Sequence, residues 1–275
     1  MKSINYISII ASALEEDIQS GDLTSESIFK PEQTCKAQLI AKQDGIIAGL
    51  AVFKKTFELV DANIKVSLNF NDGQSCKNRD VIAEISGSVL SVLAAERVAL
   101  NLLQRMSGIA TLTHEFVRLC ENRCKVLDTR KTAPNLRVLD KWAVSLGGGT
   151  NHRIGLYDMA LIKENHIKAA GGIKQAVNKV LAHDNHKHPI EVEVTNLDEL
   201  QQALNCDIDR IMLDNMDNKT MKKAVKITDG KIDLEASGNV NLKTIKGISK
   251  TGVNYISIGA LTHSVTAMDY SLLVK

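Results

Sequence analysis

Short apolar runs separated by turn residues fill the first third of the chain. Three segments have the composition of strands: residues 36–42, 64–68 and 81–85. Asp44-Gly45 and Asn71-Asp72-Gly73 lie between them, and residues of these types are typical of tight turns. The pattern predicts a small α+β domain.

Two other stretches follow the helical period. Ile7, Ile10 and Leu14 recur at positions i, i+3 and i+7, which predicts an amphipathic helix near the start of the chain. From Val89 to about Met106, apolar side chains again recur at helical spacing. This second stretch predicts a long helix that leads into a second domain.

After Cys124 the pattern changes to strand followed by helix. Candidate strands are centred near Val126, Leu161, Val192, Met212, Leu234 and Ile256. Their centres lie about 20 to 35 residues apart, which is the span of a βα unit. Repeated βα units predict a parallel sheet, either open or closed into a barrel.

A polar or small residue stands at the C-terminal end of each candidate strand. These residues are Asp128, Lys163, Glu193, Asp214, Ser237 and Gly259. Side chains and loops converge at that end of an α/β barrel, so their positions favour a barrel over an open sheet. Because the visible strands are fewer than the eight of a complete barrel, we expect an irregular α/β barrel.

Composition limits the classes of function. The chain has 275 residues, 44% of them apolar and 24% charged, with a net charge of +2, which is typical of a globular protein. Near-neutral charge and 4% aromatic residues provide neither the basic face nor the stacking surfaces that nucleic acids require. No apolar stretch approaches the roughly 18 residues of a membrane span. We therefore expect neither a nucleic-acid nor a membrane partner.

The cysteines do not form the pattern of a disulfide framework. They are odd in number and scattered: Cys35, Cys76, Cys120, Cys124 and Cys206. Cys120 and Cys124 are four residues apart, but no second pair has the spacing of a zinc site. Reduced, buried thiols and a cytoplasmic location are the expectation.

Positive charge gathers in the middle of this nearly neutral chain. Between Asp128 and Lys168 there are seven Lys or Arg against four acids. The same region contains the glycine run 147–149, whose backbone N–H groups could approach a phosphate. Arg130 and Arg153 offer planar forks that suit carboxylate or phosphate. The concentration of cations predicts a small ligand with several negative charges.

The remaining polar residues leave alternatives open. Lys163 follows an apolar run and is either a Schiff-base nucleophile or a charged ligand for an anion, and the nearby cations favour the second role. Glu191 and Glu193 share one face of a strand, and Asp214 ends the next strand. These carboxylates either form ordinary ion pairs or bind a cation such as Mg²⁺ and sugar hydroxyls.

Several long motifs occur in order and resemble the quinolinate phosphoribosyltransferase family over nearly the whole chain. They are Gly21-Asp22-Leu23-Thr24, Glu96-Arg97 with Ala99-Leu100-Asn101, residues 107–111, residues 128–132, residues 147–153, residues 161–166, residues 191–194, Leu213-Asp214-Asn215 and residues 258–264. The resemblance implies an α/β fold, with an N-terminal α/β sandwich followed by an irregular α/β barrel of fewer than eight strands. Residues 1–106 would form the sandwich, with the tail 266–275 packed back on it, and residues 107–265 would form the catalytic barrel.

The same resemblance implies the activity. Phosphoribosyl would pass from phosphoribosyl pyrophosphate to quinolinate with loss of CO₂ and pyrophosphate, giving nicotinate mononucleotide for de novo NAD synthesis. Mg²⁺ would bridge the diphosphate and the ribose oxygens. The implied assembly is a homodimer in which Arg97 reaches the site of the neighbouring subunit, and dimers could assemble further into hexamers.

The resemblance also assigns residues to the site. Arg130, His152, Arg153 and Lys163 would bind the two quinolinate carboxylates together with Arg97, and Lys131 would serve the same pocket and contact pyrophosphate. Glu193 and Asp214 would hold the ribose and, mostly through substrate, the metal. With Lys163 they are the predicted catalytic groups. Ser237, Gly238 and Gly259 would form the phosphate loop, with His263 close by.

Two departures and three rival interpretations remain. The family often has Gly where this chain has Gln19, and sometimes Ser at Ala236, but neither change removes a charge. A paralogue associated with molybdenum uptake is disfavoured by the intact set of Arg97, Arg130, His152 and Arg153. An aldolase-type barrel would form a borohydride-trappable Schiff base at Lys163. A non-catalytic binder would take up quinolinate without releasing pyrophosphate.

Overall fold

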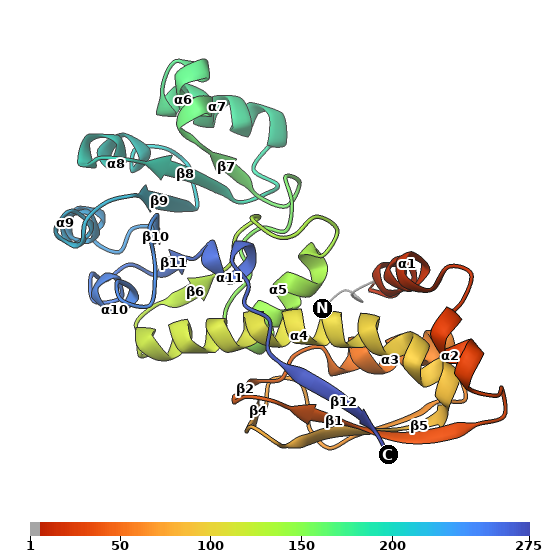
Figure 1. Ribbon diagram of the computed structural model, residues 1–275. Helices are drawn as coiled ribbons and strands as arrows, with labels where there is room; N and C mark the ends of the chain where they lie inside the picture. Colours follow the sequence, from red (N-terminus) through yellow and green to blue (C-terminus); the bar gives the residue numbers. More distant parts are fainter. Residues whose placement is uncertain (1–5) are drawn as a thin grey trace. The chain divides into compact units, whose positions relative to one another are not determined.

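The structure, a computed structural model, describes residues 6–275 and contains two compact units that alternate along the chain (Figure 1). The first unit comprises residues up to His114, Thr132–Gly148 and Thr262–Lys275, and the second comprises Glu115–Lys131 and Gly149–Leu261. The expected domain boundary at residues 106 and 107 stays a prediction. Within residues 6–275, no helix is both long and apolar enough to cross a membrane.

The first unit is built on an antiparallel sheet of four strands. In sheet order they are β12 (Tyr270–Val274), β1 (Thr34–Ala41), β5 (Val81–Ser88) and β3 (Lys65–Leu68), and a separate pair joins β2 (Gly45–Ile46) to β4 (Ser75–Cys76). Its helices include α1 (Ile7–Ile18), α2 (Leu23–Ile28), α3 (Leu50–Val60) and α5 (Arg137–Leu146). Phe53 and Phe57 of α3 pack with Leu39 and Ile82 of the sheet and with Leu103 of the long helix α4 (Val89–Cys120). Burial of these side chains joins the helices to one face of the sheet.

The three strands expected in the first third of the chain are confirmed, and the helix that follows them is longer than expected. The prediction ended it near Met106, whereas α4 continues to Cys120. Ser107 stays helical with its hydroxyl bonded to the backbone of Ala48, accepting its N–H at 3.0 Å. A Cβ at Gly108 would lie 2.1 Å from the carbonyl oxygen of Thr266, so glycine there allows another segment to approach closely instead of ending the helix.

The amphipathic helix expected near the N-terminus is present as α1. Ile10 and Leu14 are buried, as their spacing predicts. Ile7, the first member of the set, is instead 47% exposed. It stands in the first turn of the helix, so only the later turns of α1 present their apolar face to the core.

A buried ion pair joins three segments of the first unit. Nε and Nη2 of Arg105 donate to the two carboxylate oxygens of Asp140, each at 2.8 Å, and Asp140 is fully buried. The N–H of Ala133 also donates to Asp140, and Arg105 reaches the carbonyl of Thr262. The pair therefore ties α5 and the loop before it to α4 and to the start of the C-terminal segment.

We expect Asp140→Ala to lower the free energy of unfolding by about 3–5 kcal/mol, because it leaves Arg105 without its buried partner. Thermal unfolding measures the effect. Asp44→Ala is the matched control, since Asp44 pairs with Lys77 on the surface, where both side chains are exposed. Its melting temperature should stay close to that of the wild type. Equal losses from both variants would contradict this account.

The second unit contains a parallel sheet of six strands. In sheet order they are β6 (Lys125–Leu127), β11 (Tyr255–Ser257), β10 (Asp233–Ser237), β9 (Arg210–Asp214), β8 (Ile190–Val194) and β7 (Ala160–Ile162). Between them stand α6 (Glu164–Ala170), α7 (Ile173–Asp184), α8 (Leu197–Ala203), α9 (Asn218–Thr228) and α10 (Ile245–Ile248), and α11 (Ala260–His263) follows β11. All six expected strands are confirmed. β6 and β7 form the two edges of the sheet, which agrees with an irregular barrel of fewer than eight strands.

Candidate active site

The C-terminal ends of the parallel strands bring most of the predicted site residues to one edge of the second unit. Lys163 follows β7, Glu193 lies in β8, Asp214 and Ser237 end β9 and β10, and Asp128 and Gly259 follow β6 and β11 after one and two residues. Because the strands are parallel, these ends share one side of the sheet. Arg97 on α4 and His263 at the end of α11 belong to the first unit, and the side chain of Arg97 is exposed.

Asp128 connects the segment that follows β6 to the segment that follows the glycine run 147–149. It is fully buried, and its carboxylate accepts the backbone N–H of His152 at 2.8 Å and the side-chain amide of Asn151 at 2.6 Å. The segment before His152 also runs beside β6, where the N–H of Thr150 donates to the carbonyl of Val126 at 2.8 Å. These bonds place the residues that follow β6 next to those that follow the glycine run.

The side chain of Arg153 is anchored by its own loop and is influenced by the charge of Arg130. Arg153 Nη1 donates to the carbonyl of Met159 at 3.1 Å, and Asp158 closes the intervening loop by accepting the N–H groups of Ile154 and Gly155. Burial lowers the pKa of Arg153, and the charge of Arg130 lowers it further. The charges of Glu191 and Asp158 act in the opposite direction, and a bound anion would also favour the charged form of Arg153.

Lys163, Glu193 and Asp214 form a second group at the same edge. Burial raises the pKa of Glu193, the charge of Asp214 raises it further, and Lys163 acts in the opposite direction. The backbone N–H of Lys163 donates to Nδ1 of His166 at 3.0 Å, which fixes the first turn of α6. Lys163 is exposed. The site therefore offers a pair of acids from neighbouring strands beside a mobile cation.

Asn215 joins the loops after β9 and β10, a role that its place in the Leu213-Asp214-Asn215 motif did not predict. Its N–H donates to the carbonyl of Ser237 at 2.9 Å, and its side-chain amide donates to Asp214 at 2.7 Å. The side chain of Asn239 donates in turn to Asn215 at 3.2 Å. Gly238 has a φ of +100°, and a Cβ there would lie 2.1 Å from Oδ1 of Asn215. Glycine at 238 is therefore required both for backbone conformation and for space.

We expect Gly238→Ala to lower the free energy of unfolding by about 2 kcal/mol, from left-handed strain and the contact with Asn215. Gly230→Ala is the matched control. Gly230 has a φ of +70°, but nothing lies within 4 Å of its Cβ position, so this variant measures strain alone. Thermal melts of both variants separate the two effects. Equal melting temperatures would show that the Asn215 contact contributes nothing.

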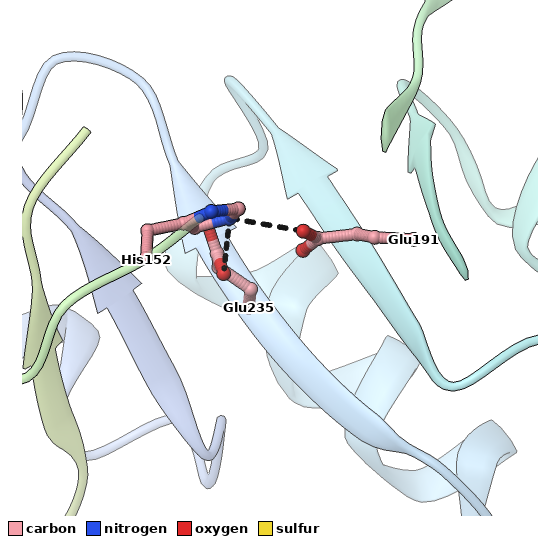
Figure 2. Close-up of side chains that lie close together, drawn as sticks. All are labelled: His152, Glu191 and Glu235. Carbon is pink, nitrogen blue, oxygen red and sulfur yellow. Dashed lines mark ion pairs between the residues drawn. The ribbon is translucent and has the colours of Figure 1, made fainter. Parts of the chain in front are cut away.

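A buried cluster lies beneath this edge, and sequence reasoning largely missed it (Figure 2). Nε2 of His152 is 2.9 Å from Oε2 of Glu191 and 3.4 Å from Oε2 of Glu235, and both glutamates are fully buried. Arg210 Nη1 donates to Glu235 Oε2 at 3.0 Å, and the hydroxyl of Ser257 donates to Oε1. Below the C-terminal ends of the strands, the interior of the barrel thus contains charged groups. Branched aliphatic side chains are usual at such positions.

The shifts in pKa within this cluster follow from burial and charge. Burial raises the pKa of Glu191. Burial also acts to raise the pKa of Glu235, but His152, Ser257 and Arg210 outweigh it and lower that pKa. For His152, burial acts to lower the pKa, and the two carboxylates outweigh it and raise it to about 9.

These three residues have ligand atoms within 4.8 Å of one another, a spacing that a metal ion could also use. His152 is poorly suited to such a role. Its Nδ1 accepts the backbone N–H of Arg153 at 2.7 Å, so the proton of the neutral ring lies on Nε2, the nitrogen that faces the carboxylates. A protonated nitrogen cannot coordinate a metal.

Two family models match the chain in succession. "Quinolinate phosphoribosyl transferase, N-terminal domain" matches residues 22–107, and "Quinolinate phosphoribosyl transferase, C-terminal domain" matches residues 109–273. Together they cover most of the chain.

Similar proteins and structures carry related names. A Bacillus subtilis protein named "Probable nicotinate-nucleotide pyrophosphorylase [carboxylating]" is 48% identical over 94% of this chain and 89% of its own length. The chloroplastic nicotinate-nucleotide pyrophosphorylase of Arabidopsis thaliana is 44% identical over 97% of this chain and 82% of its own. The crystal structure of NadC from Streptococcus pyogenes has a TM-score of 0.96 and 39% identity, covering 100% of this chain and 98% of that one. The nicotinate-nucleotide pyrophosphorylase of Francisella tularensis has a TM-score of 0.95 and 42% identity, with the same coverage.

Proposed function

The chain belongs to the quinolinate phosphoribosyltransferase family, and from this we propose that it converts quinolinate and phosphoribosyl pyrophosphate into nicotinate mononucleotide, pyrophosphate and CO₂. This reaction supplies NAD biosynthesis. The relatives at 42–48% identity are named either nicotinate-nucleotide pyrophosphorylase [carboxylating] or quinolinate phosphoribosyltransferase [decarboxylating], and they match this chain over more than nine-tenths of its length.

The feature that supports this proposal most directly is the pair of arginines, Arg130 and Arg153, in the same unit as the acids Glu193 and Asp214. Quinolinate is a dicarboxylate, and two adjacent arginines present planar forks to two carboxylates. Arg130 and Arg153 are the groups for this role, with Lys163 as a mobile third charge. Quinolinate carries two carboxylates and nicotinate carries one, so two guanidinium groups match quinolinate better than nicotinate.

Glu193 and Asp214 suit the ribose and a divalent cation. Oxygen ligands are those that Mg²⁺ prefers. The charge of Asp214 raises the pKa of Glu193, and a nearby cation would act in the opposite direction. Bound Mg²⁺ would neutralise charge on the pyrophosphate leaving group. The carboxylates would also accept bonds from the ribose hydroxyls and stabilise positive charge that develops on the sugar.

The phosphate groups have their own set of residues. Ser237, Gly238 and Gly259 supply small side chains and backbone N–H groups after neighbouring strands, where α/β barrels commonly bind phosphate. Lys131, which is exposed, would contact the pyrophosphate, and His263 stays a predicted member of the phosphate-binding set.

The chemistry needs positioning more than acid or base catalysis. The ring nitrogen of quinolinate attacks the anomeric carbon of the ribose as the bond to the pyrophosphate oxygen breaks. The ring then carries a positive charge and can accept the electron pair of the carbon–carboxylate bond as CO₂ departs. A proton takes the place of the carboxylate, so this step requires no dedicated base.

The assembly we propose is a homodimer in which Arg97 completes the site of the neighbouring subunit. Arg97 is exposed on α4, as such a role requires. The cysteines of the described chain are all free, which suits a reducing cytoplasm.

The first experiment is to incubate the purified protein with quinolinate, phosphoribosyl pyrophosphate and Mg²⁺, and to follow nicotinate mononucleotide formation. Nicotinate in place of quinolinate is the control acceptor. Turnover of quinolinate alone is the expected result. Binding of quinolinate without release of pyrophosphate would instead identify a non-catalytic binder, and the proposal would fail.

A further inference from the structure

The carboxylate of Asp128 joins the two chain segments that carry Arg130 and Arg153. Asp128 is fully buried and belongs to none of the substrate-binding groups proposed above. Its two oxygens accept different donors: Oδ1 accepts the backbone N–H of His152 at 2.8 Å, and Oδ2 accepts the side-chain amide of Asn151 at 2.6 Å. Bonds to a carboxylate are charge-assisted, and in a buried place they are costly to break. The carboxylate therefore holds both segments in one arrangement.

The backbone register of the two segments relates the two arginines to each other. The end of β6 runs parallel to the segment after the glycine run, with Leu127 paired to Thr150, and the N–H of Thr150 donates to the carbonyl of Val126 at 2.8 Å. Arg130 and Arg153 each follow this pair by three residues. They therefore occupy equivalent positions on two segments that start side by side.

Backbone pairing ends just before the arginines, and the side chain of Asp128 continues the connection. The last backbone bond, from the N–H of Asp128 to the carbonyl of Thr150, is 3.3 Å long, and neither described segment continues as a strand beyond it. In the same register Asn151 stands opposite Asp128, and His152 is the next residue. The carboxylate bonds to both, so side-chain hydrogen bonds replace the ladder where the ladder stops.

Each arginine also has a local anchor on its own segment. The hydroxyl of Thr129 accepts the N–H of Lys131 at 3.1 Å, which forms a tight turn around the backbone of Arg130. Nη1 of Arg153 donates to the carbonyl of Met159 at 3.1 Å. Both arginines are half-buried. These anchors fix each arginine within its segment, whereas the distance between the segments depends on the bonds that cross from one to the other.

That distance matters for the acceptor of the proposed reaction. Quinolinate carries carboxylates on adjacent ring carbons, so two guanidinium groups can bind both of them only at a matching separation. Nicotinate carries one carboxylate, and a single guanidinium group is enough to bind it. The energetic preference for quinolinate over nicotinate therefore depends on how the two arginines are placed relative to each other.

We propose that Asp128 is a positioning residue that holds Arg130 and Arg153 at the spacing of two adjacent carboxylates, and that it thereby sets the preference for quinolinate over nicotinate. The inference rests on the proposed function. Asp128 bonds only the backbone N–H of His152 in this account, so the predicted role of the His152 side chain is unaffected.

The first test measures binding by calorimetry and requires no turnover. Asp128→Ala removes both acceptors, so the Kd for quinolinate should rise by about tenfold as the arginines lose their spacing. The Kd for nicotinate should stay within about twofold of the wild-type value, because one arginine still suffices. The ratio of the two affinities should therefore fall. A folded Asp128→Ala protein with an unchanged ratio would overturn the proposal.

The conservative variant Asp128→Asn provides a graded result. Its amide oxygen can still accept the N–H of His152 but carries no charge, so the Kd for quinolinate should rise by about threefold, less than in the alanine variant. If Asp128→Ala does not fold, this variant decides. Wild-type discrimination between quinolinate and nicotinate in Asp128→Asn would then overturn the proposal.

Asp72 supplies the matched control for a purely structural role. Its carboxylate accepts the backbone N–H groups of Gly49 at 2.7 Å and Leu50 at 2.9 Å, in the first unit. Asp72→Ala and Asp72→Asn should lower the melting temperature, as the Asp128 variants do, but should leave the ratio of the two affinities unchanged. An equal fall of that ratio in both sets of variants would show that loss of stability alone is responsible.

Steady-state kinetics adds a second readout. In Asp128→Asn the KM for quinolinate should rise while the KM for phosphoribosyl pyrophosphate stays constant, and an equal rise of both would contradict positioning of the arginine pair. Failure of the proposed function is distinguishable from failure of this inference. If the wild-type protein binds no quinolinate, the proposed function fails and the inference fails with it. If the wild type binds and converts quinolinate but the Asp128 variants discriminate normally, only the inference fails.

Discussion

Replacing Arg153 with alanine will lower kcat/KM for quinolinate by about 10²–10³-fold, because a partly buried charged partner of the substrate carboxylate is lost. The backbone of Arg153 is fixed by His152, and its side chain by the carbonyl of Met159. The truncated side chain leaves Arg130 to hold the carboxylates with Lys163. Steady-state kinetics with each substrate varied in turn measures the loss.

Two further variants decide what Arg153 contributes. Arg153→Lys keeps the charge but loses the planar fork, so its loss should fall between the wild type and the alanine variant. Arg123→Ala is the control, since Arg123 forms an exposed ion pair with Glu121 in the same unit, and its kinetics should be unchanged. A folded Arg153→Ala protein with normal use of quinolinate, or with a defect only in phosphoribosyl pyrophosphate, would contradict the assignment.

The helices and strands could be predicted from the sequence where the spacing of apolar residues along the chain determines them. The six strands of the parallel sheet were each visible as apolar runs at the spacing of βα units. The end of α4 was not, because glycine normally weakens a helix, whereas Gly108 is needed there for the close approach of Thr266. The spacing of apolar residues shows which face of a helix or strand is apolar, but it does not show which distant segment packs on that face.

The candidate site could likewise be predicted from the sequence only in part. The residues at strand ends could be placed because parallel strands bring their ends together. Glu235 and Arg210 could not, since a charged residue within a strand usually indicates a solvated face, and here it marks a barrel interior. Gly147 was interpreted as part of a phosphate-binding run, yet a Cβ there would lie 2.4 Å from the carbonyl oxygen of Ala110, so helix packing also requires it.

Arg97→Ala and Lys163→Ala should each lose more than about 10²-fold of activity, yet a mixture refolded or co-expressed together should recover part of it. The reason is the proposed assembly. In a hybrid dimer one site carries both substitutions and the other carries neither, if Arg97 comes from one subunit and Lys163 from the other. Random pairing makes about half of the dimers hybrid, so recovery should approach about a quarter of wild-type activity per subunit.

A second mixture is the control for any effect of mixing two variants that does not depend on which subunit supplies each residue. Lys163 and Arg153 belong to the same unit of the same chain, so hybrids of Lys163→Ala with Arg153→Ala have at least one defect in every site and should stay inactive. Recovery in the first mixture but not in the second would establish that Arg97 crosses between subunits. If neither mixture recovers although mass spectrometry detects the hybrids, each chain carries its whole site and the shared-site proposal is wrong.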